Sequence, residues 1–271
     1  MPRAHVSGIN LYYEVSGLGP SVVFCHGYTG SHQDWVFQVP VLAREYQVVT
    51  MDHRGHGASD APSSADAYSI PIFADDLYAL LNYLGITKCC LVGHSMGGFA
   101  ALRLVLDQPH VVGSLVLVDT ASGPVNIPGY ADMRARLLEI AQTDGMEAVF
   151  EYNARYNPLS LRRFEKYPGL FGIVKRRMLE MPVEGYVYAG RALSERQDLT
   201  GRLNEISVPT LVMVGGEDSP FLRPSKTLVE GIPDAMLRVV PQAMHSPHEE
   251  EAEAFNEILL EFLTQVMPGA T

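Results

Sequence analysis

Short apolar runs alternate with stretches of helical periodicity over most of the chain. The apolar runs that predict strands occupy residues 21–25, 46–51, 89–92 and 114–118. Between the later runs, apolar positions recur at helical spacing, as in residues 72–81 and 96–107. Strands buried on both faces with helices between them are typical of a parallel sheet covered by helices. The pattern therefore predicts an α/β fold.

The pattern extends toward both ends of the chain. Ser7-Gly8 separates two short runs within residues 6–17, which predicts a β-hairpin. Near the other end, strands are predicted at residues 209–214 and 236–240, with helices at 224–230 and 249–266.

Residues 122–206 differ from the rest of the chain. They show amphipathic helical patches interrupted by prolines and no convincing strand pattern. They hold 12 Lys or Arg against 11 Asp or Glu, whereas the remaining residues hold 8 against 20. We predict a helical cap at residues 122–206, inserted into a core formed by residues 1–121 and 207–271. Turn residues near Ser122 and Pro209 are typical of such boundaries.

The composition narrows the class of protein. With 271 residues, 47% of them hydrophobic, the chain can bury a large core. Its net charge of -11 argues against a nucleic-acid partner, because phosphate binding draws on a concentrated basic surface. The N-terminal residues lack an apolar signal core, and no stretch reaches the roughly 18 apolar residues of a membrane span. The three cysteines are too few for a disulfide framework and lack metal-ligand spacing. We expect a cytoplasmic protein with no membrane partner, metal or cofactor.

One serine lies between glycines directly after a predicted strand. The segment Gly93-His94-Ser95-Met96-Gly97 matches the G-x-S-x-G signature and leads into the helical pattern of residues 96–107. Such a sharp turn strains its central residue, and the glycines let strand and helix approach closely. The helix N-terminus also directs amides at negative charge beside the serine. Ser95 is therefore the candidate nucleophile.

A serine hydroxyl needs a base within hydrogen-bond reach and an acid that orients the base. In open parallel sheets the ligand site gathers at the carboxyl ends of strands, so both partners are sought there. Asp218 and His245 follow the last two predicted strands. Asp119, after the strand at 114–118, is an alternative acid. His248 is an alternative base, although its place near an acidic helix start favours capping or charge pairing.

Two backbone amides are needed to bind the oxyanion that forms on the substrate. One comes from the residue after the nucleophile, Met96, and the other from the loop after the third strand, where Tyr28 stands. His26 in that loop is a candidate for substrate contact, although bracing the loop through hydrogen bonds is the more usual role at this position.

These motifs together resemble the α/β-hydrolase superfamily. They are His26-Gly27, residues 52–59, residues 93–98, residues 216–218 and residues 245–248, in that family's order and approximate spacing. The resemblance covers nearly the whole chain and implies an α/β-hydrolase fold, in which residues 52–59 form a tight structural loop and the helical cap lies over the pocket. Dehalogenases and epoxide hydrolases of this family carry aspartate where Ser95 stands, which makes their chemistry unlike this chain's.

Two other members of that family are also similar. The loop at residues 27–31 is similar to that of the menaquinone-pathway synthase that eliminates pyruvate, but that enzyme carries arginine directly after the elbow glycines, where this chain has Phe99. Carbon–carbon hydrolases acting on ring-cleavage products commonly have asparagine at the position of His94.

The predicted cap holds nine Phe or Tyr residues, which favours an apolar pocket. Candidate substrate-binding residues, besides His26, are Phe99, Phe150, Tyr152 and Tyr186. Packing of the cap on the core would require apolar residues as well. The pairs Arg162-Arg163 and Arg176-Arg177 are expected on a solvated helix face rather than at an anionic substrate.

The leading hypothesis is a cofactor-independent serine esterase or lactonase acting on small to medium, mostly apolar substrates through an acyl-enzyme. One alternative is a carbon–carbon hydrolase or elimination enzyme on the same triad, which would need a polar, arginine-bearing pocket. The other is a small-molecule receptor of the same fold.

Overall fold

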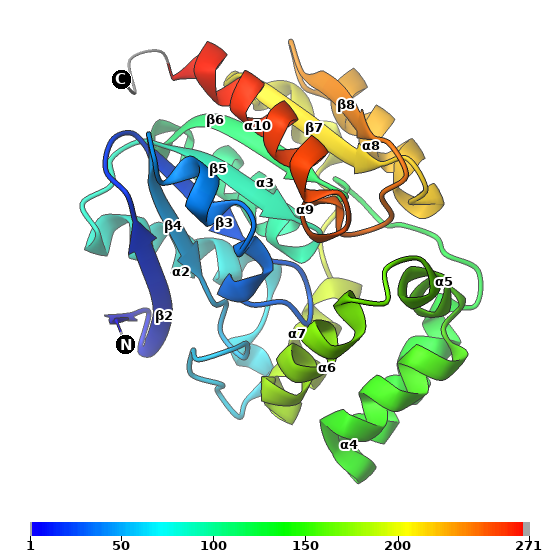
Figure 1. Cartoon of the computed structure of the whole chain (residues 1–271). Helices are drawn as coiled ribbons and strands as arrows, with labels where there is room; N and C mark the ends of the chain where they lie inside the picture. Colours follow the sequence, from blue (N-terminus) through cyan, green and yellow to red (C-terminus); the bar gives the residue numbers. More distant parts are fainter. Residues whose placement is uncertain (1, 268–271) are drawn as a thin grey trace.

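The computed structural model describes residues 2–267 and has an eight-stranded sheet with helices on both faces (Figure 1). The strand order is β1-β2-β4-β3-β5-β6-β7-β8. β2 pairs antiparallel with β1 and β4, and the other neighbouring strands are parallel. The α/β fold with a mostly parallel sheet, predicted from the apolar pattern, is confirmed.

The strands are β1 (Arg3–Val6), β2 (Ile9–Ser16), β3 (Ser21–Cys25), β4 (Gln47–Met51), β5 (Cys89–His94), β6 (Val112–Val118), β7 (Thr210–Gly215) and β8 (Met236–Val240). The α-helices are α1 (Val39–Leu42), α2 (Ile70–Tyr83), α3 (Met96–Asp107), α4 (Tyr130–Tyr156), α5 (Pro158–Lys166), α6 (Leu170–Glu180), α7 (Val183–Ser194), α8 (Ser219–Gly231), α9 (Pro247–Glu250) and α10 (Ala252–Val266). Short 3-10 helices are η1 (His32–Trp35), η2 (Ala65–Ala67), η3 (Pro109–Val111) and η4 (Thr200–Glu205).

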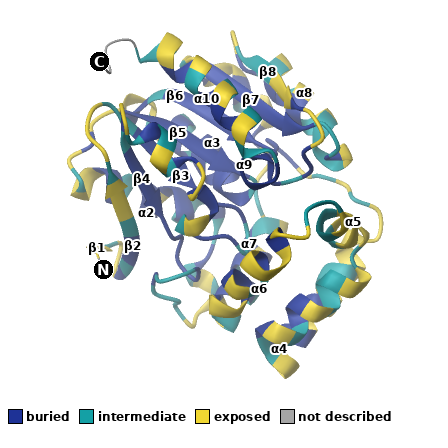
Figure 2. Cartoon of the chain, viewed as in Figure 1, coloured by how far each residue is buried: buried dark blue, intermediate teal, exposed yellow. Residues whose placement is uncertain are grey.

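Neighbouring residues of the central strands pack on opposite faces of the sheet. Leu91 of β5 lies in an apolar cluster with residues of α2, α3 and α8. Val92, the next residue, lies in a second cluster with α1 and α10. Every residue of β5 is buried, as Figure 2 shows for the middle of the sheet. Burial on both faces explains why these strands appear in the sequence as unbroken apolar runs.

Several boundaries differ from the sequence prediction. The hairpin turn is where it was expected, with positive φ at Ser7 (51°) and Gly8 (75°). Helix α8 begins at Ser219, five residues before Pro224, because Pro220 occupies the first turn, where proline is preferred, and Pro224 lies inside the helix. The helix expected at 249–266 is two helices, divided at Glu251, whose φ of -134° is not helical.

Between β6 and β7 the chain leaves the sheet and forms helices α4 to α7 (Figure 1). These helices share an apolar cluster of their own, which includes Leu137, Phe150 and Met178. They lie at the carboxyl ends of the strands, since the Tyr28 hydroxyl, after β3, donates to the backbone carbonyl of Tyr186 in α7 at 2.6 Å. Within residues 2–267, no helix combines the length and apolar character needed to cross a membrane.

Helix α7 rests directly on the backbone that follows β4. A Cβ added to Gly185 would lie 1.8 Å from the carbonyl oxygen of Gly55. Only glycine at position 185 permits this contact, so the sequence itself sets how closely α7 approaches the core.

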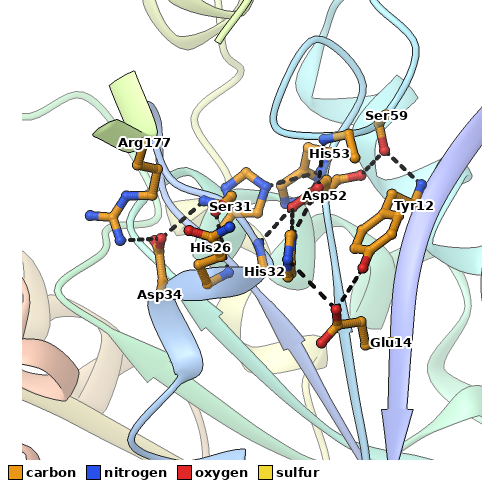
Figure 3. A network of polar contacts seen from close by, with 12 residues as sticks. Tyr12, Glu14, His26, Ser31, His32, Asp34, Asp52, His53, Ser59 and Arg177 are labelled. Carbon is orange, nitrogen blue, oxygen red and sulfur yellow. Dashed lines mark hydrogen bonds and ion pairs between the residues drawn. The ribbon is translucent and has the colours of Figure 1, made fainter. Parts of the chain in front are cut away.

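Helices α5 and α6 are held to the core by buried ion pairs. Arg177 of α6 places Nη1 2.6 Å from Oδ1 of Asp34 and 2.8 Å from Oε1 of Glu249. Arg163 of α5 places Nη2 2.8 Å from Oε2 of Glu249 and Nε 2.8 Å from Oε1 of Glu250. Figure 3 shows the contact between Arg177 and Asp34.

These contacts correct the prediction that both arginine pairs lie on a solvated face. Arg162 and Arg176 are exposed, but Arg177 is buried and the side chain of Arg163 is mostly covered. A buried guanidinium needs a carboxylate partner, and the partners belong to the core, far away in the sequence.

Substituting Gly185 tests the contact between α7 and the core. Gly185→Ala should destabilise the protein by about 1–3 kcal/mol, because the added Cβ collides with backbone. The control is Gly172→Ala in α6, whose Cβ would meet nothing within 4 Å. That change should be neutral or stabilising by up to ~1 kcal/mol through helix propensity. Urea unfolding of both variants measures the difference, and equal midpoints would contradict the contact.

Removing the buried guanidinium tests the ion pairs. Arg177→Gln leaves Asp34 and Glu249 buried without their shared cation, which should cost about 3–5 kcal/mol. Arg176→Gln is the matched control, because Arg176 is exposed and should change stability by less than about 0.5 kcal/mol. Thermal unfolding followed by circular dichroism would show a large fall in Tm for the first variant only. A loss below about 1 kcal/mol would mean that Arg177 does not hold the helices in place.

Candidate active site

Ser95 occupies the turn between β5 and α3 with a backbone that L-residues rarely adopt. Its φ is 49° and its ψ is -110°. The turn is fixed by hydrogen bonds on both sides: Ser95 N donates to Val118 O at 2.9 Å, and the Thr120 hydroxyl donates to Ser95 O at 2.8 Å. Strain of this kind persists only where the surrounding structure enforces it.

The loop after β3 packs closely against this turn. A Cβ on Gly97 would lie 2.3 Å from the carbonyl oxygen of Cys25, and one on Gly27 would lie 3.3 Å from Cβ of Ser95. Tyr28 follows in the same loop. Met96 is the first residue of α3, so its N–H has no acceptor within the helix. Both backbone amides predicted for the oxyanion therefore come from segments that meet beside Ser95.

The structure brings Ser95, His245 and Asp218 into one chain of hydrogen bonds. His245 Nδ1 donates to Asp218 Oδ2 at 2.7 Å, and the Ser95 hydroxyl lies 3.0 Å from His245 Nε2. With the proton on Nδ1, Nε2 is free to accept from the serine. Asp218 is buried and the His245 side chain is 39% exposed, so the base is reachable from solvent.

Asp119, the alternative acid of the sequence, lies beside Asp218 instead of replacing it. β6 and β7 are neighbours in the sheet, which places Asp119 and Asp218 after adjacent strand ends. Asp119 is fully buried, and its Oδ1 accepts from Gly215 N at 3.0 Å. Burial, followed by the charge of Asp218, raises the pKa of Asp119 well above its ordinary value. Burial and the charge of Asp218 thus favour the protonated form of Asp119, which can donate a hydrogen bond to Asp218.

His94, which precedes the serine, supports the base. Its Nε2 donates to the backbone carbonyl of His245 at 2.6 Å. Burial and the neighbouring His248 and His245 lower the pKa of His94 well below its ordinary value, so the ring is neutral. No role was predicted for this side chain, although its position directly before the nucleophile was the available signal.

His248, the alternative base, does not reach Ser95 by a hydrogen bond. Its ring is fully buried and stacks on Trp35 with centroids 4.5 Å apart. The expected capping or charge-pairing role is also wrong, since among residues 2–267 neither ring nitrogen has a hydrogen-bond partner.

His26 braces the loop after β3 rather than facing a substrate. It is fully buried, its Nδ1 donates to Gly27 O at 2.7 Å, and its Nε2 accepts from His53 N at 3.0 Å. The prediction that His26 contacts substrate is therefore corrected, because both ring nitrogens already have partners.

The segment at residues 52–59 is held by a polar network beneath this loop (Figure 3). Asp52 accepts from His32 N at 2.6 Å, His32 Nδ1 at 2.9 Å and Ala58 N at 2.8 Å. Burial lowers the pKa of His32, but the hydrogen bond and charge of Asp52 outweigh it and leave that pKa raised. The network fixes the loops on which the site is built.

The remaining candidate substrate-binding residues divide into two groups. Phe99 follows Ser95 by one helical turn, and Tyr186 stacks on Tyr28 with centroids 5.1 Å apart. Phe150 instead packs with Phe164 and Phe171 inside the cluster of helices α4 to α6. Tyr152 lines a surface hollow on α4 with Tyr156 and Arg136. Burial of Phe150 inside this cluster contradicts its predicted contact with a substrate, because helical periodicity does not show which face of α4 meets the core, whereas contact between Tyr152 and a substrate stays a prediction.

Among residues 2–267, two groups of acidic and histidine side chains have ligand-type atoms within 4.8 Å of one another: Asp34, His94 and His248, and Asp119, Asp218 and His245. Neither donor set suits a cation. Arg177 already places its positive charge 2.6 Å from Asp34, and His245 is hydrogen-bonded to Asp218.

The ion pairs of helices α5 and α6 reach the same loops as the acid and base. Glu217, directly before Asp218, lies 2.7 Å from Lys166 and from Arg162. Glu249 and Glu250 follow His245 closely, and Glu250 also accepts from Met244 N at 2.6 Å. The helices are thus attached to the loops that carry Asp218 and His245.

Comparisons with known proteins agree with this architecture. A family model of the alpha/beta hydrolase fold matches residues 20–252. The chain is 30% identical to a putative 2-succinyl-6-hydroxy-2,4-cyclohexadiene-1-carboxylate synthase of Bacillus subtilis strain 168, over 94% of this chain and 95% of that protein. It is 32% identical to a putative carbamate hydrolase, RutD, of Variovorax paradoxus strain S110, over 96% and 98% of the two chains. The solved thermophilic esterase from Thermogutta terrifontis, with malate bound, superposes with a TM-score of 0.87 at 28% identity, covering 98% of each chain. The chain therefore belongs to the α/β-hydrolase fold family.

Proposed function

We propose that the protein is a serine hydrolase that cleaves carboxylic esters or lactones of small to medium size through an acyl-enzyme. The observation that carries the proposal is the hydrogen-bonded chain from Ser95 through His245 to Asp218, with distances of 3.0 and 2.7 Å. This arrangement is what a serine nucleophile requires at neutral pH.

The proposed reaction follows from these contacts. Ser95 Oγ attacks the substrate carbonyl while His245 Nε2 takes the hydroxyl proton. Asp218 accepts the hydrogen bond from Nδ1–H of His245 and stabilises the imidazolium that forms. His245 then gives its proton to the leaving oxygen, which leaves an acyl group on Ser95. Water, activated by the same histidine, releases the acid.

The oxyanion of each tetrahedral intermediate is assigned to the backbone amides of Met96 and Tyr28. Met96 lies at the N-terminus of α3, where free N–H groups and the helix dipole favour negative charge. Because the donors are backbone N–H groups, the identity of their side chains matters little. The support for the assignment is the close packing of the loop against Ser95.

Helices α4 to α7 are proposed to act as a cap that shapes the substrate pocket. The support is their position at the carboxyl ends of the strands and their attachment to the loops of the acid and base. The aromatic contact between Tyr28 and Tyr186 joins the cap to the oxyanion loop.

Other reactions can use the same three side chains. The relatives named as a putative synthase and a putative carbamate hydrolase favour elimination and carbamate cleavage as second candidates. A receptor of this fold would bind its ligand without sustained turnover. The esterase proposal has the more direct support, because the hydrogen-bonded chain of Ser95, His245 and Asp218 generates an acyl-enzyme from any activated carbonyl.

Hydrolysis of 4-nitrophenyl esters, from acetate to octanoate, tests the proposal. The wild type should turn over continuously, and Ser95→Ala should lower kcat by roughly 10⁴-fold or more, because the nucleophile is lost. Ser63→Ala, at an exposed serine, is the control and should leave kcat unchanged.

No turnover above that of Ser95→Ala would overturn ester hydrolysis. Turnover of vinylogous diketones would then support carbon–carbon cleavage, and release of carbon dioxide from carbamates would support the carbamate reaction. A ligand-induced rise in Tm without turnover would support a receptor.

Asparagine substitutions separate the roles of the two aspartates. Asp218→Asn should lower kcat by about 10³–10⁴-fold, because the imidazole loses its orienting charge. Asp119→Asn should stay within about 10-fold of the wild type, since an amide donates a hydrogen bond as the protonated acid does.

The pH dependence of stability gives a second measure. The folded-state pKa of Asp119 is raised, so the stability that its proton provides is present at low pH and is lost as pH rises through that pKa. The Tm of Asp119→Asn should therefore fall less than that of the wild type on the alkaline side. Equal kcat losses for the two asparagine variants would show that Asp119 acts as the ionised acid.

A further inference from the structure

In the part of the chain that the structure describes, two arginines that are not exposed have no carboxylate partner. Within residues 2–267, the arginines without a carboxylate oxygen in ion-pair range are Arg44, Arg134, Arg155, Arg176, Arg196, Arg223 and Arg238. Only Arg134 and Arg196 in this set are not exposed. Covered guanidinium groups are ordinarily paired, so these two require an explanation.

Arg196 lies over the helix that follows Ser95. Its guanidinium carbon is 4.4 Å from the centroid of the Phe99 ring. It donates to the backbone carbonyls of Leu193 and Gly123, which fixes the direction of the side chain. Its Nε is buried, with no hydrogen-bond partner among the described residues.

Arg134 reaches the same region from α4. Its guanidinium carbon is 6.0 Å from the centroid of the Tyr28 ring. Nη2 points toward α7, because a Cβ on Gly190 would lie 3.4 Å from it and 2.8 Å from the Tyr28 hydroxyl. Both Nε and Nη2 are buried and lack a partner in the part of the chain that the structure describes.

The two guanidinium groups lie over the rings of Tyr28 and Phe99, which pack in one apolar cluster. Burial and then the charge of Arg134 lower the pKa of Arg196. Two cations held near each other in a partly dry region repel each other, and among the described residues Nε of Arg196 and Nε and Nη2 of Arg134 have no acceptor. A structural role in packing therefore does not account for the pair.

The aromatic rings that these arginines contact, those of Tyr28 and Phe99, belong to residues of the proposed active site. Phe99 N donates to Ser95 O at 3.2 Å, and Tyr28 is the residue assigned to the oxyanion. Phe99 also lies in an apolar cluster with Met96, Ala121 and Ala189, which joins α3 to α7. The pair therefore lies against the rings of Tyr28 and Phe99, in the apolar cluster that includes Met96, the residue after Ser95.

We propose that Arg134 and Arg196 form a carboxylate-binding subsite, and that the natural substrate is an ester or lactone bearing a free carboxylate. This proposal rests on the serine-hydrolase function proposed above. A carboxylate offers two oxygens to the free N–H groups, and its charge removes the repulsion between the arginines. This carboxylate-bearing substrate replaces the mostly apolar substrate expected from the aromatic content of the helices, and the arginine pair is also the polar feature that the carbon–carbon or elimination alternative would need.

A matched pair of esters tests the subsite. 4-Nitrophenyl hemisuccinate carries a carboxylate, and 4-nitrophenyl levulinate has a neutral methyl ketone in the same place. The wild type should prefer the hemisuccinate. Arg134→Gln and Arg196→Gln should each raise KM for the hemisuccinate by ~10-fold or more, the usual effect of losing a charge-assisted hydrogen bond. Their kcat/KM for the levulinate should stay within about twofold of the wild type.

Arg136→Gln in α4 and Arg191→Gln in α7 are the controls. Both arginines are exposed and paired with a neighbouring glutamate, so neither change should alter the preference. Arg196→Lys keeps the charge and should restore part of the preference. Equal losses on both esters, or an unchanged preference in the glutamine variants, would overturn the subsite.

A binding measurement separates this proposal from the hydrolase proposal. In the Ser95→Ala protein, monomethyl succinate should raise Tm and methyl levulinate should not, and Arg196→Gln should abolish the rise. An arginine-dependent rise in a protein whose wild type hydrolyses neither ester would support the subsite and overturn the hydrolase function. Ester turnover with no arginine-dependent rise would do the reverse.

Discussion

The site depends on the strained backbone of Ser95. A φ of 49° at a serine costs about 1–3 kcal/mol, which the turn alone cannot supply. The sheet supplies it, because Ser95 N is bonded to the end of β6 and Gly97 packs on the end of β3. The strain lifts the serine side chain above the sheet, where the loops after β3, β7 and β8 converge. The buried strands therefore matter to function through the conformation they impose on one residue.

The ion pairs between the helices and the core have a second consequence beyond stability. Buried pairs often contribute little net stability, because desolvation offsets the attraction. Here their carboxylates lie next to the acid and the base in the sequence: Glu217 precedes Asp218, and Glu249 and Glu250 follow His245. Any displacement of α5 or α6 therefore pulls on the loops that orient the imidazole. The arrangement links the position of the helices to the geometry of the site.

Local pattern predicted the strands, the turn at Ser95 and the order of Ser95, Asp218 and His245, because these depend on apolar runs and on residues at strand ends. It did not predict features that depend on which strands are neighbours. Asp119 and Asp218 looked like rivals in the sequence, yet β6 and β7 lie side by side and bring both together. Arg177 looked solvated because its partners, Asp34 and Glu249, belong to remote segments. Phe150 and Phe99 were equally apolar in the sequence, and only packing assigns one to the interior of the helices.

The charges around Ser95 are unevenly distributed. Asp218 and Glu250 are buried on the side of β7 and β8, whereas Arg134 and Arg196 lie on the side of Tyr28 and Phe99. An anionic substrate is repelled by the first group and attracted by the second, so its carboxylate can occupy only one side of the serine. Its scissile carbonyl then lies between the arginines and His245, with the oxygen near the N-terminus of α3. On this argument the arginines contribute orientation as well as affinity, because they set which end of the substrate meets the base.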